Sequence, residues 1–300
     1  MTTIRLATRA SALAMVQSES VAALLRAADP SVEVEFVRIT TEGDADRTTP
    51  LSILGGRGVF VRGVEEALLL GNADIAVHSL KDVPTEAVPG LILGAMLERA
   101  DPRDAFVGGQ GRRLAELPSG ARVGTSSQRR RALLRALRPD VEIVELRGNV
   151  DTRLRKVADG EVDGAILAAA GLARLGRFAE ATQVFDAMEF LPAPGQGVIA
   201  VECREDDAAT LALLAHLDDA RTRAAVEAER GFLGALGSGC TLPVGAYAQV
   251  DGSLIALRAM IASVEGAPPL FADASGPVAQ AAALGRGLGE RMLASTQEQA

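Results

Sequence analysis

Residues 191–197 read LPAPGQG, and this stretch decides how the chain is divided, because its prolines and glycines predict a connection between folded elements. A second connection is predicted at residues 98–104, ERADPRD, which are polar and interrupted by Pro102. The two connections bracket residues 105–190. We therefore expect a second domain inserted into the first, so that the chain leaves the first domain, builds the second and returns. Two lobes joined by two crossings would form a cleft.

Outward from these connections, short β-branched runs alternate with Ala- and Leu-rich stretches, an order typical of βαβ units and parallel-rich sheets. The predicted strands are residues 4–7, 32–40, 75–77, 91–96, 122–124, 142–146, 165–168 and 198–202. The predicted helices are residues 11–27, 59–70, 128–137 and 152–158. From about residue 220 the pattern becomes a helix at 221–236, strands at 245–250 and 254–261, and a helix at 278–293, which predicts a small α+β domain.

The expected fold class is thus α/β, with two lobes followed by a small α+β domain. The first domain is predicted to be discontinuous, with residues 1–97 and 198–217. Residues 98–197 form the predicted inserted domain, and residues 218–300 the predicted C-terminal domain.

Charge is unevenly distributed along the chain. The whole chain carries a net charge of −8, has 3% aromatic residues and has no Trp, so it lacks the basic surface and stacking side chains of a general nucleic-acid binder. Residues 112–156, however, hold eleven Arg and one Lys against five acidic residues, a local net charge of +7. If an anion is bound, we expect this segment to take part.

The sequence predicts neither export nor a membrane span. No apolar signal-like region follows the first residues, and the longest uncharged run, residues 231–250, contains five glycines and a proline. We expect a cytoplasmic protein with free thiols at both of its cysteines. The two histidines are not grouped with cysteines at metal-ligand spacing, so no metal site is expected.

One local arrangement occurs three times: a short strand, a turn containing Arg with Ser, Thr or Asn, and the start of a helix. It is found at residues 4–11, 123–131 and 144–153. Ligands of open α/β sheets bind at the carboxyl ends of strands, where helix N-termini offer N–H groups to anions. The same residues also fit ordinary helix N-caps and solvated arginines. Three repetitions favour a polyanion site, strongest at the adjacent Arg129 and Arg130.

The bound anion is not fixed by these residues. Residues 54–58, LGGRG, lack the Gly-rich phosphate-binding pattern that ends in Lys and Ser or Thr. Several carboxylates fit an arginine-rich site at least as well as phosphate does, because guanidinium groups bind carboxylates with two parallel hydrogen bonds.

Residues 73–84, ADIAVHSLKDVP, place Lys81 and Asp82 at the carboxyl end of a buried-looking strand. Asp82 there could act as a general acid or base, or stabilise developing positive charge. A salt-bridged strand end is the plainer interpretation. We interpret His78 as a core residue with a satisfied hydrogen bond.

The two cysteines have different settings. Cys203 alternates like a buried strand residue, so we interpret it as a small core side chain. Cys240 lies in the glycine-rich stretch GSGCTLP at residues 237–243, whose glycines allow an exposed, tightly turned backbone. A reactive or modified thiolate and an inert thiol are both open for Cys240.

Together these segments closely resemble the porphobilinogen deaminase (hydroxymethylbilane synthase) family. The matching strings occur in family order and cover nearly the whole chain: ATR at 7–9, HSLKDVP at 78–84, DPRDAF at 101–106, GTSS at 124–127, LRGN at 146–149 and the Gly-Cys turn at 239–240. The resemblance implies two lobes like those of type II periplasmic binding proteins, plus a small α+β domain that carries the cysteine.

The resemblance also implies a dipyrromethane cofactor, attached through a thioether to Cys240. It implies head-to-tail condensation of four porphobilinogen molecules, with loss of ammonia, followed by hydrolytic release of hydroxymethylbilane. Asp82 matches the catalytic residue, which would stabilise the cationic azafulvene and pass protons at the pyrrole nitrogens. The positions that match cofactor contacts are Lys81, Asp82, Thr125, Ser127, Arg129, Arg130, Asn149 and Arg153. Those that match substrate contacts are Arg9, Ser11, Arg147, Arg153, Arg174 and, on a hinge, Gln196.

The family also implies a monomer that acts on porphobilinogen and the growing polypyrrole, without nucleic acid or membrane. Two departures stand out: Arg57 occupies a position where the family commonly has Lys, and Ser238 one where it commonly has Gly. Two alternatives from other classes remain open from the residues alone. One is a two-lobed binding protein for a dicarboxylate or oxyanion, and the other is a hydrolase with a cysteine nucleophile.

Overall fold

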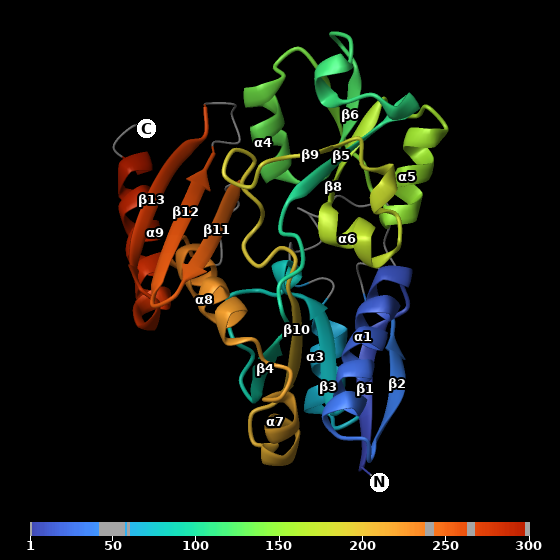
Figure 1. Ribbon diagram of the computed structural model, residues 1–300, viewed down its shortest axis with the longest axis vertical. Coiled ribbons are helices and arrows are strands. Elements are labelled where there is room, and N and C mark those ends of the chain that lie inside the picture. Colours follow the sequence, from blue (N-terminus) through green and yellow to red (C-terminus); the bar gives the residue numbers. More distant parts are fainter. Residues whose placement is uncertain (1, 42–57, 59–60, 238–242, 263–267, 298–300) are drawn as a thin grey trace. The chain divides into compact units, whose positions relative to one another are not determined.

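The computed structural model describes residues 2–41, 58, 61–237, 243–262 and 268–297 (Figure 1). The chain divides into two compact units. The first consists of Met1–Ala100 and Val198–Arg223, and the second of Asp101–Gly197 and Ala224–Ala300. The chain therefore passes from the first unit to the second and back before its C-terminal part joins the second unit.

A five-stranded sheet forms the centre of the first unit, in the order β2-β1-β3-β10-β4. Strands β1, β2 and β3 run parallel, whereas β10 runs antiparallel to both of its neighbours, β3 and β4. The strands are β1 (Thr2–Arg9), β2 (Val32–Ile39), β3 (Ile75–Ser79), β4 (Leu91–Met96) and β10 (Ile199–Arg204). The helices that begin in this unit are α1 (Ala12–Ala28), α3 (Arg62–Leu69), α7 (Ala208–Leu214) and α8 (Ala220–Ala235), with a short 3₁₀ turn, η2, at Leu80–Asp82.

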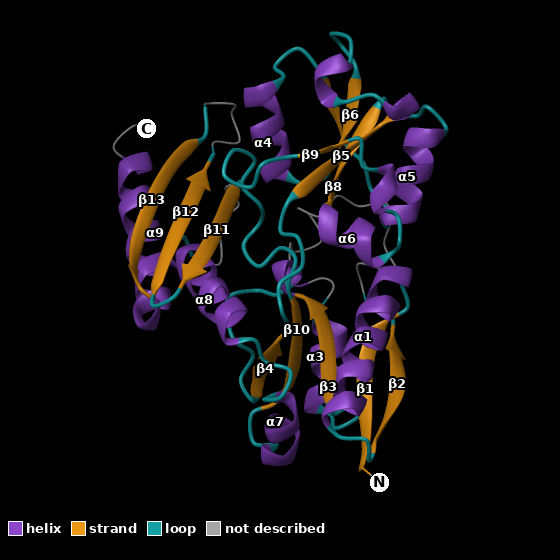
Figure 2. Ribbon diagram, in the orientation of Figure 1, coloured by secondary structure: helices purple, strands orange, loops and turns teal. Residues whose placement is uncertain are grey.

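Both faces of this sheet are covered. Helix α1 lies over β1 and its neighbours (Figure 2), and Val21 and Leu25 of α1 pack with Leu6 and Ile75 of the sheet. Helix α3 covers the opposite face, where its apolar residues meet Ala7 of β1 and Ala76 of β3. Strand β3 is buried on both sides for this reason, which explains its nearly continuous apolar sequence.

A second five-stranded sheet, in the order β7-β6-β8-β5-β9, forms the core of residues 101–197, which we call the second lobe. Strands β6, β7 and β8 run parallel, and β5 runs antiparallel to β8 and β9. The strands are β5 (Asp104–Gly108), β6 (Arg122–Gly124), β7 (Glu142–Val144), β8 (Gly164–Ala168) and β9 (Gln183–Val184). The helices are α4 (Gln128–Leu137), α5 (Val150–Ala158) and α6 (Ala169–Arg174), and 3₁₀ turns lie at Gly109–Gly111, Leu114–Glu116 and Phe178–Glu180.

The two sheets share one topology. In each, three parallel strands are joined by helices, and the strand beside the third runs the opposite way. That antiparallel strand is the one that follows a crossing of the chain: β5 follows the first crossing and β10 follows the second. In each sheet, therefore, the antiparallel inner strand is the first strand that the chain forms after a crossing.

The C-terminal part of the second unit is a three-stranded antiparallel sheet, β11-β12-β13, with helices. Its elements are β11 (Val244–Asp251), β12 (Leu254–Ile261), β13 (Leu270–Pro277), a 3₁₀ turn at Val278–Gln280 and α9 (Ala281–Gln297). One face of this sheet packs with residues of α8 and α9, such as Phe232 and Leu288. Part of the opposite face, at Met260, joins the core of the second lobe beside Phe190 and Leu191.

The predicted fold class is confirmed, because two α/β lobes and a small C-terminal sheet are present. The three predicted domain boundaries remain a prediction. Several elements differ from the sequence expectations. Asp104, which we assigned to a connection, begins strand β5, and α5 begins at Val150, not 152, because Asn149 caps it. The elements that were not predicted are β5, β9, β13, α6 and α7.

Helices α8 and α9 approach so closely that glycine is required between them. A Cβ atom at Gly285 would lie 1.9 Å from the carbonyl oxygen of Ala228, and one at Gly231 would lie 2.4 Å from that of Ala282. Gly234, also in α8, has no atom within 4 Å of its Cβ position. The contact between the two backbones therefore depends on particular glycines.

We expect Gly285→Ala to lower the free energy of unfolding by about 3 kcal/mol, because the methyl group would push α9 away from α8. Gly234→Ala is the matched control and should raise that free energy by about 0.5 kcal/mol, the gain in helix propensity alone. Thermal and denaturant unfolding of the two variants measures both effects. A Gly285→Ala protein as stable as the unaltered chain would contradict the close contact.

Candidate functional site

Four of the predicted site residues lie at the carboxyl edge of the sheet in the first unit. Strand β1 ends at Arg9 and is followed by Ser11, which caps α1 by accepting a hydrogen bond from the N–H of Ala14 at 3.3 Å. Strand β3, parallel to β1 and paired with it, ends just before Lys81 and Asp82. The parallel pairing brings both strand ends to one edge, as expected for a ligand site of an open sheet.

The turn that carries Lys81 and Asp82 is anchored by a backbone hydrogen bond to the residue that precedes β10. Leu80 is buried, and its N–H donates to the carbonyl oxygen of Val198 at 3.0 Å. Lys81 and Asp82 are half-buried, so their side chains remain partly accessible at the strand end. A rigid backbone under two partly accessible charged groups suits residues that must meet a substrate in a fixed position.

His78 is buried within the sheet. Its Nε2 lies 3.0 Å from Oε2 of Glu202, a neighbour on β10 that is also buried. Burial raises the pKa of Glu65 on α3, and the charge of Glu202 raises it further. The interpretation of His78 as a core residue with a satisfied hydrogen bond is confirmed.

A second group of predicted residues lies at the carboxyl edge of the sheet in the second lobe. Ser127 caps α4 by accepting a hydrogen bond from the N–H of Arg130 at 3.4 Å, and the N–H of Ser127 donates to Oγ1 of the buried Thr125 at 3.2 Å. Asn149 caps α5 through the N–H of Thr152 at 2.9 Å. The ordinary N-cap interpretation therefore describes Ser127 and Asn149 in this structure.

Gly148 makes the start of α5 possible. Its φ is +108°, and a Cβ atom there would lie 2.7 Å from Cγ2 of Thr152. Its carbonyl oxygen accepts a hydrogen bond from Nε of Arg153 at 2.8 Å. Arg147 and Arg153 are both half-buried and flank this turn.

Arg129 and Arg130 are nearly buried and both contact the carboxylate of Asp104. Nη1 of Arg129 lies 2.7 Å from Oδ2 of Asp104, while Nε and Nη2 of Arg130 lie 3.1 and 2.7 Å from Oδ1. Asp104 has no exposed surface. Burial alone would raise the pKa of Asp104, but the charges and hydrogen bonds of the two arginines outweigh it and hold this pKa well below its usual range.

Sequence reasoning missed Asp104. The residue stands in the quoted string DPRDAF, but we gave it no role. The sequence feature that could have revealed its burial is the alternation of side chains along a strand. Asp104 and Phe106 lie on the same face of β5, and Phe106 is fully buried. An acidic residue in register with a buried aromatic residue needs a cationic partner.

Arg174 and Gln196 lie beside the second crossing. Nη2 of Arg174 donates to the carbonyl oxygen of Gly197 at 2.7 Å, and burial lowers the pKa of Arg174. Within the described part of the chain, no carboxylate lies at ion-pair distance from Arg174. Nε2 of Gln196 donates to the carbonyl oxygen of Pro102 at 2.7 Å and to Oδ1 of Asp104 at 3.0 Å.

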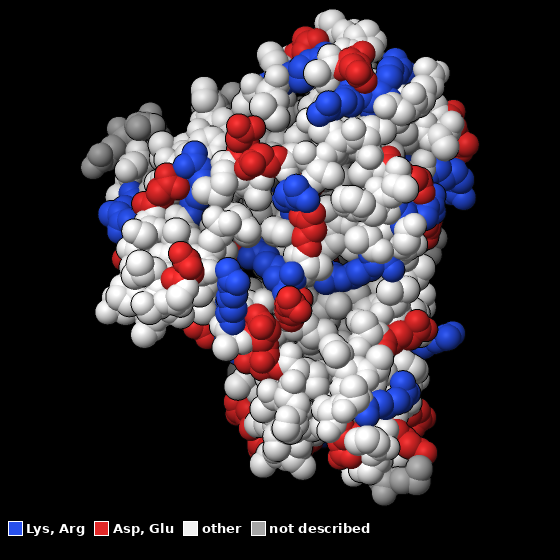
Figure 3. Space-filling model, in the orientation of Figure 1, with Lys and Arg blue, Asp and Glu red and all other residues white. Residues whose placement is uncertain are grey.

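Among the exposed ion pairs of residues 112–156, that of Lys156 with Glu161 brings in an acidic residue from outside the segment and so offsets part of its net charge of +7. The pairs of Arg131 with Glu145 and of Arg138 with Asp140 join residues that are already counted in that net charge. Basic and acidic side chains also lie next to each other on the face drawn in Figure 3. These exposed pairs fit the interpretation of a solvated surface and add little stability.

The predicted site residues thus fall into two groups, one in each unit. Arg9, Ser11, Lys81 and Asp82 belong to the first, and Thr125, Ser127, Arg129, Arg130, Arg147, Asn149, Arg153, Arg174 and Gln196 belong to the second. Cys240, Arg57 and Ser238 lie outside the described residues. Among the described residues, no group of His, Cys, Asp and Glu could hold a metal ion, and no helix is long and apolar enough to cross a membrane.

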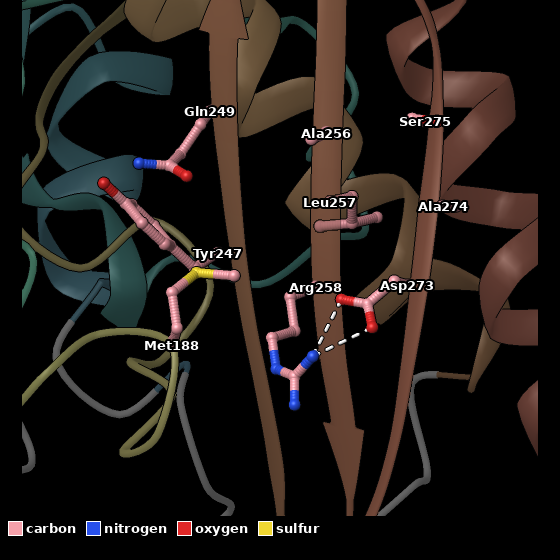
Figure 4. Close-up of a pocket in the computed structure, with 9 residues that line it drawn as sticks. All are labelled: Met188, Tyr247, Gln249, Ala256, Leu257, Arg258, Asp273, Ala274 and Ser275. Carbon is pink, nitrogen blue, oxygen red and sulfur yellow. Dashed lines mark hydrogen bonds and ion pairs between the residues drawn. The ribbon is translucent and has the colours of Figure 1, made fainter.

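A shallow cavity of about 300 Å³ lies on the C-terminal sheet (Figure 4). Tyr247 and Gln249 of β11 and Arg258 of β12 line it, and Arg258 is paired with Asp273 of β13 at 2.8 Å. None of the predicted site residues lines this cavity. The charge of Arg258 is matched within the sheet itself.

Cys203 lies in β10 and has no exposed surface. Burial raises the pKa of its thiol from 9.0 to about 11, with a smaller contribution from the charge of Asp207. The interpretation of Cys203 as a small core side chain is confirmed.

Comparison with known proteins finds matches along almost the entire chain. Residues 4–212 match the family model described as porphobilinogen deaminase, dipyromethane cofactor binding domain, and residues 223–294 match the porphobilinogen deaminase C-terminal domain. The porphobilinogen deaminase of Syntrophus aciditrophicus is 47% identical over 290 residues, which cover 97% of this chain and 95% of that protein. That of Xanthomonas euvesicatoria is 51% identical over 286 residues, covering 95% and 94%.

Among solved structures, the methionine-binding protein MetQ matches with a TM-score of 0.47 and 16% identity. The match covers 72% of this chain and 89% of that protein.

We expect Cys203 to resist alkylation in the folded protein. A pKa of about 11 in place of 9.0 leaves about a hundredfold less thiolate near neutral pH, and burial blocks access as well. In a Cys240→Ser variant, mass spectrometry after iodoacetamide treatment should show modification only once the chain is unfolded. Equal rates for folded and unfolded protein would contradict the assignment.

Proposed function

This chain belongs to the porphobilinogen deaminase family, and from that premise we propose how its residues divide the work of joining porphobilinogen into hydroxymethylbilane. The enzyme condenses porphobilinogen head to tail with loss of ammonia, on a dipyrromethane cofactor. Membership in this family excludes the two alternatives considered from the residues alone, a non-catalytic binding protein and a cysteine hydrolase.

The donor set of the second lobe fits a dipyrromethane. Each pyrrole ring carries an acetate and a propionate, so the cofactor and the growing chain are polycarboxylates. Nε of Arg129 is buried and has no hydrogen-bond partner among the described residues. We propose that Arg129 and Arg130, with Thr125, Ser127, Asn149 and Arg153, hold the cofactor carboxylates. Lys81 and Asp82, which belong to the first unit, are also proposed to contact the cofactor. When bound, the dipyrromethane supplies the pyrrole to which the first porphobilinogen is joined.

Cys240 is the proposed attachment point of the cofactor. The chain contains two cysteines, and Cys203 is buried in a strand with a raised thiol pKa. A thioether requires a nucleophilic sulfur that can meet the cofactor, which Cys203 does not offer. This contrast supports Cys240, together with the resemblance of its Gly-Cys turn to the family pattern.

Asp82 is the proposed catalytic residue. Loss of ammonia from porphobilinogen generates positive charge, which a carboxylate fixed at a strand end stabilises. The same carboxylate can accept and return the proton of a pyrrole nitrogen. The half-buried position of Asp82 on a turn anchored through Leu80 supports both tasks.

The remaining polar residues are proposed to bind the carboxylates of the incoming substrate. Arg174 supports this assignment most directly, because its guanidinium is largely buried and lacks a carboxylate partner among the described residues. The others proposed for this role are Arg9, Ser11, Arg147, Arg153 and Gln196.

We also propose that the protein works in the cytoplasm as a monomer, without nucleic acid or membrane. The net charge of −8 supports the absence of a nucleic-acid partner. The free thiol of Cys203 fits a reducing compartment.

Intact mass tests the cofactor assignment. We expect the purified protein to carry an addition equal to two pyrrole units, and peptide mapping to place it on Cys240. Cys240→Ser should lack the addition, and Cys203→Ser, the matched control, should keep it. A fully active protein without any addition would refute the assignment.

Asp82→Asn tests the catalytic role. The substitution keeps the size of the side chain and removes its charge, so the fold should be retained while condensation falls by a factor of at least about a hundred. Ammonia release and the appearance of hydroxymethylbilane from porphobilinogen measure the change. Turnover close to that of the unaltered enzyme would remove Asp82 from the mechanism.

A further inference from the structure

The second lobe contains one buried carboxylate on which several donors converge. Asp104 accepts hydrogen bonds from Arg129, Arg130 and Gln196, at distances between 2.7 and 3.1 Å. These donors come from the first turn of α4 and from the second crossing, while Asp104 itself begins β5 directly after the first crossing. Four separate hydrogen bonds to one side chain are more than an ordinary surface ion pair makes.

The charges explain why this carboxylate is needed. Arg129 and Arg130 are adjacent in the chain, and each exposes only 5–6% of its surface. Two neighbouring guanidinium groups repel each other, and neither is well solvated at such burial. Asp104 is the acidic partner that offsets them, and it leaves the cluster with a net positive charge of one.

The cluster is also tied to the backbone around it. Nη1 of Arg130 donates to the carbonyl oxygen of Ile166 in β8 at 2.9 Å, and Nη1 of Arg129 donates to that of Leu191 at 2.5 Å. Nε2 of Gln196 joins Asp104 to the carbonyl oxygen of Pro102. Both guanidinium groups are therefore fixed in position relative to the central strand of the lobe and to the second crossing.

Arg129 and Arg130 differ in what they have left to offer. The hydrogen bonds of Arg130 use Nε, Nη1 and Nη2. Those of Arg129 use Nη1, and its buried Nε has no partner among the described residues. The residual positive charge and the unused donor both point to Arg129 as the group prepared for a further anion.

We propose that Asp104 is the positioning residue of the cofactor site: it holds Arg130 as a support and presents Arg129 to one carboxylate of the dipyrromethane. This inference rests on the proposed function, because it takes the dipyrromethane as the ligand. It adds a residue, and a division of labour between the two arginines, that the sequence did not indicate.

Glu229 provides a matched control for simple loss of stability. It is fully buried in the same unit, and its carboxylate accepts hydrogen bonds from the N–H groups of Gly195 and Ala248 at 2.7 and 2.9 Å. Glu229→Gln removes a buried charge from the same unit, and the side chains of Asp104, Arg129 and Arg130 are themselves unaltered.

Cofactor assembly by the full-length apo protein provides the test. Protein made in a host without porphobilinogen is mixed with porphobilinogen, and intact mass follows the addition of two pyrrole units over time. Circular dichroism and thermal unfolding of each apo variant report the fold. We expect Asp104→Asn to assemble the cofactor at least about tenfold more slowly, since small misplacements of a binding group cost factors of that size. Glu229→Gln should assemble it at close to the normal rate despite a lower melting temperature.

Asp104→Glu keeps the charge but moves it by one methylene group. It should fold, should assemble the cofactor faster than Asp104→Asn, and should remain severalfold slower than the unaltered protein. If Asp104→Asn does not fold, Asp104→Glu provides the test instead. Normal cofactor assembly by Asp104→Glu would overturn the proposal. Slowed assembly at an unchanged melting temperature would support it.

Two further results would also overturn the proposal: normal assembly by a folded Asp104→Asn protein, or equal slowing by Glu229→Gln. Failure of the unaltered apo protein to gain any mass would instead refute the proposed function, and so is distinguishable from failure of the positioning role.

Discussion

The ion cluster of Asp104 with Arg129 and Arg130 is the interaction on which the second lobe depends most. The opposite charges of this cluster stabilise one another in the interior, because leaving a buried charge unpaired costs on the order of 3–5 kcal/mol. The cluster joins the first residue of β5, the first turn of α4 and the second crossing. A charge requirement thus fixes the backbone around the two arginines that we propose for the cofactor site.

Both sheets, each considered by itself, present polar groups in the same way. Parallel strands end at one edge, and the helices that follow begin there with capped N-termini at Ser11, Ser127 and Asn149. The caps occupy the side-chain oxygens of these residues, so the arginines and lysine beside them carry the positive charge available to a ligand. The structure therefore supports the N-cap interpretation of the strand–turn–helix repeats for the small polar residues, and the proposed binding of anions rests mainly on the cations beside them.

Local patterns in the sequence were enough to predict the residues whose setting depends on near neighbours. Alternation placed Cys203 in the core, and position at the end of a strand marked Lys81 and Asp82. Asp104 was missed because its partners lie more than twenty residues away, and only the antiparallel placement of β5 beside β8 brings it under α4. Strand β13 was missed because LFADASGP has weak strand propensity and is held by pairing with β12 along its whole length. Strand propensity describes one segment in isolation. The burial of Asp104 and the formation of β13 depend instead on contacts with segments far away in the sequence or on the neighbouring strand.

The origin of the antiparallel strands has a consequence for how the chain acquires its structure during synthesis. Strand β10 lies between β3 and β4, and it is the partner that joins β4 to the sheet, yet it is made only after the whole inserted lobe. The lobe at 101–197 receives β5 from its own beginning and can complete its sheet at once. On a ribosome, which releases the chain from its N-terminus, the second lobe is therefore able to fold before the first. Until β10 emerges, β3 exposes an unpaired apolar edge, the kind of surface that chaperones bind and that aggregation exploits.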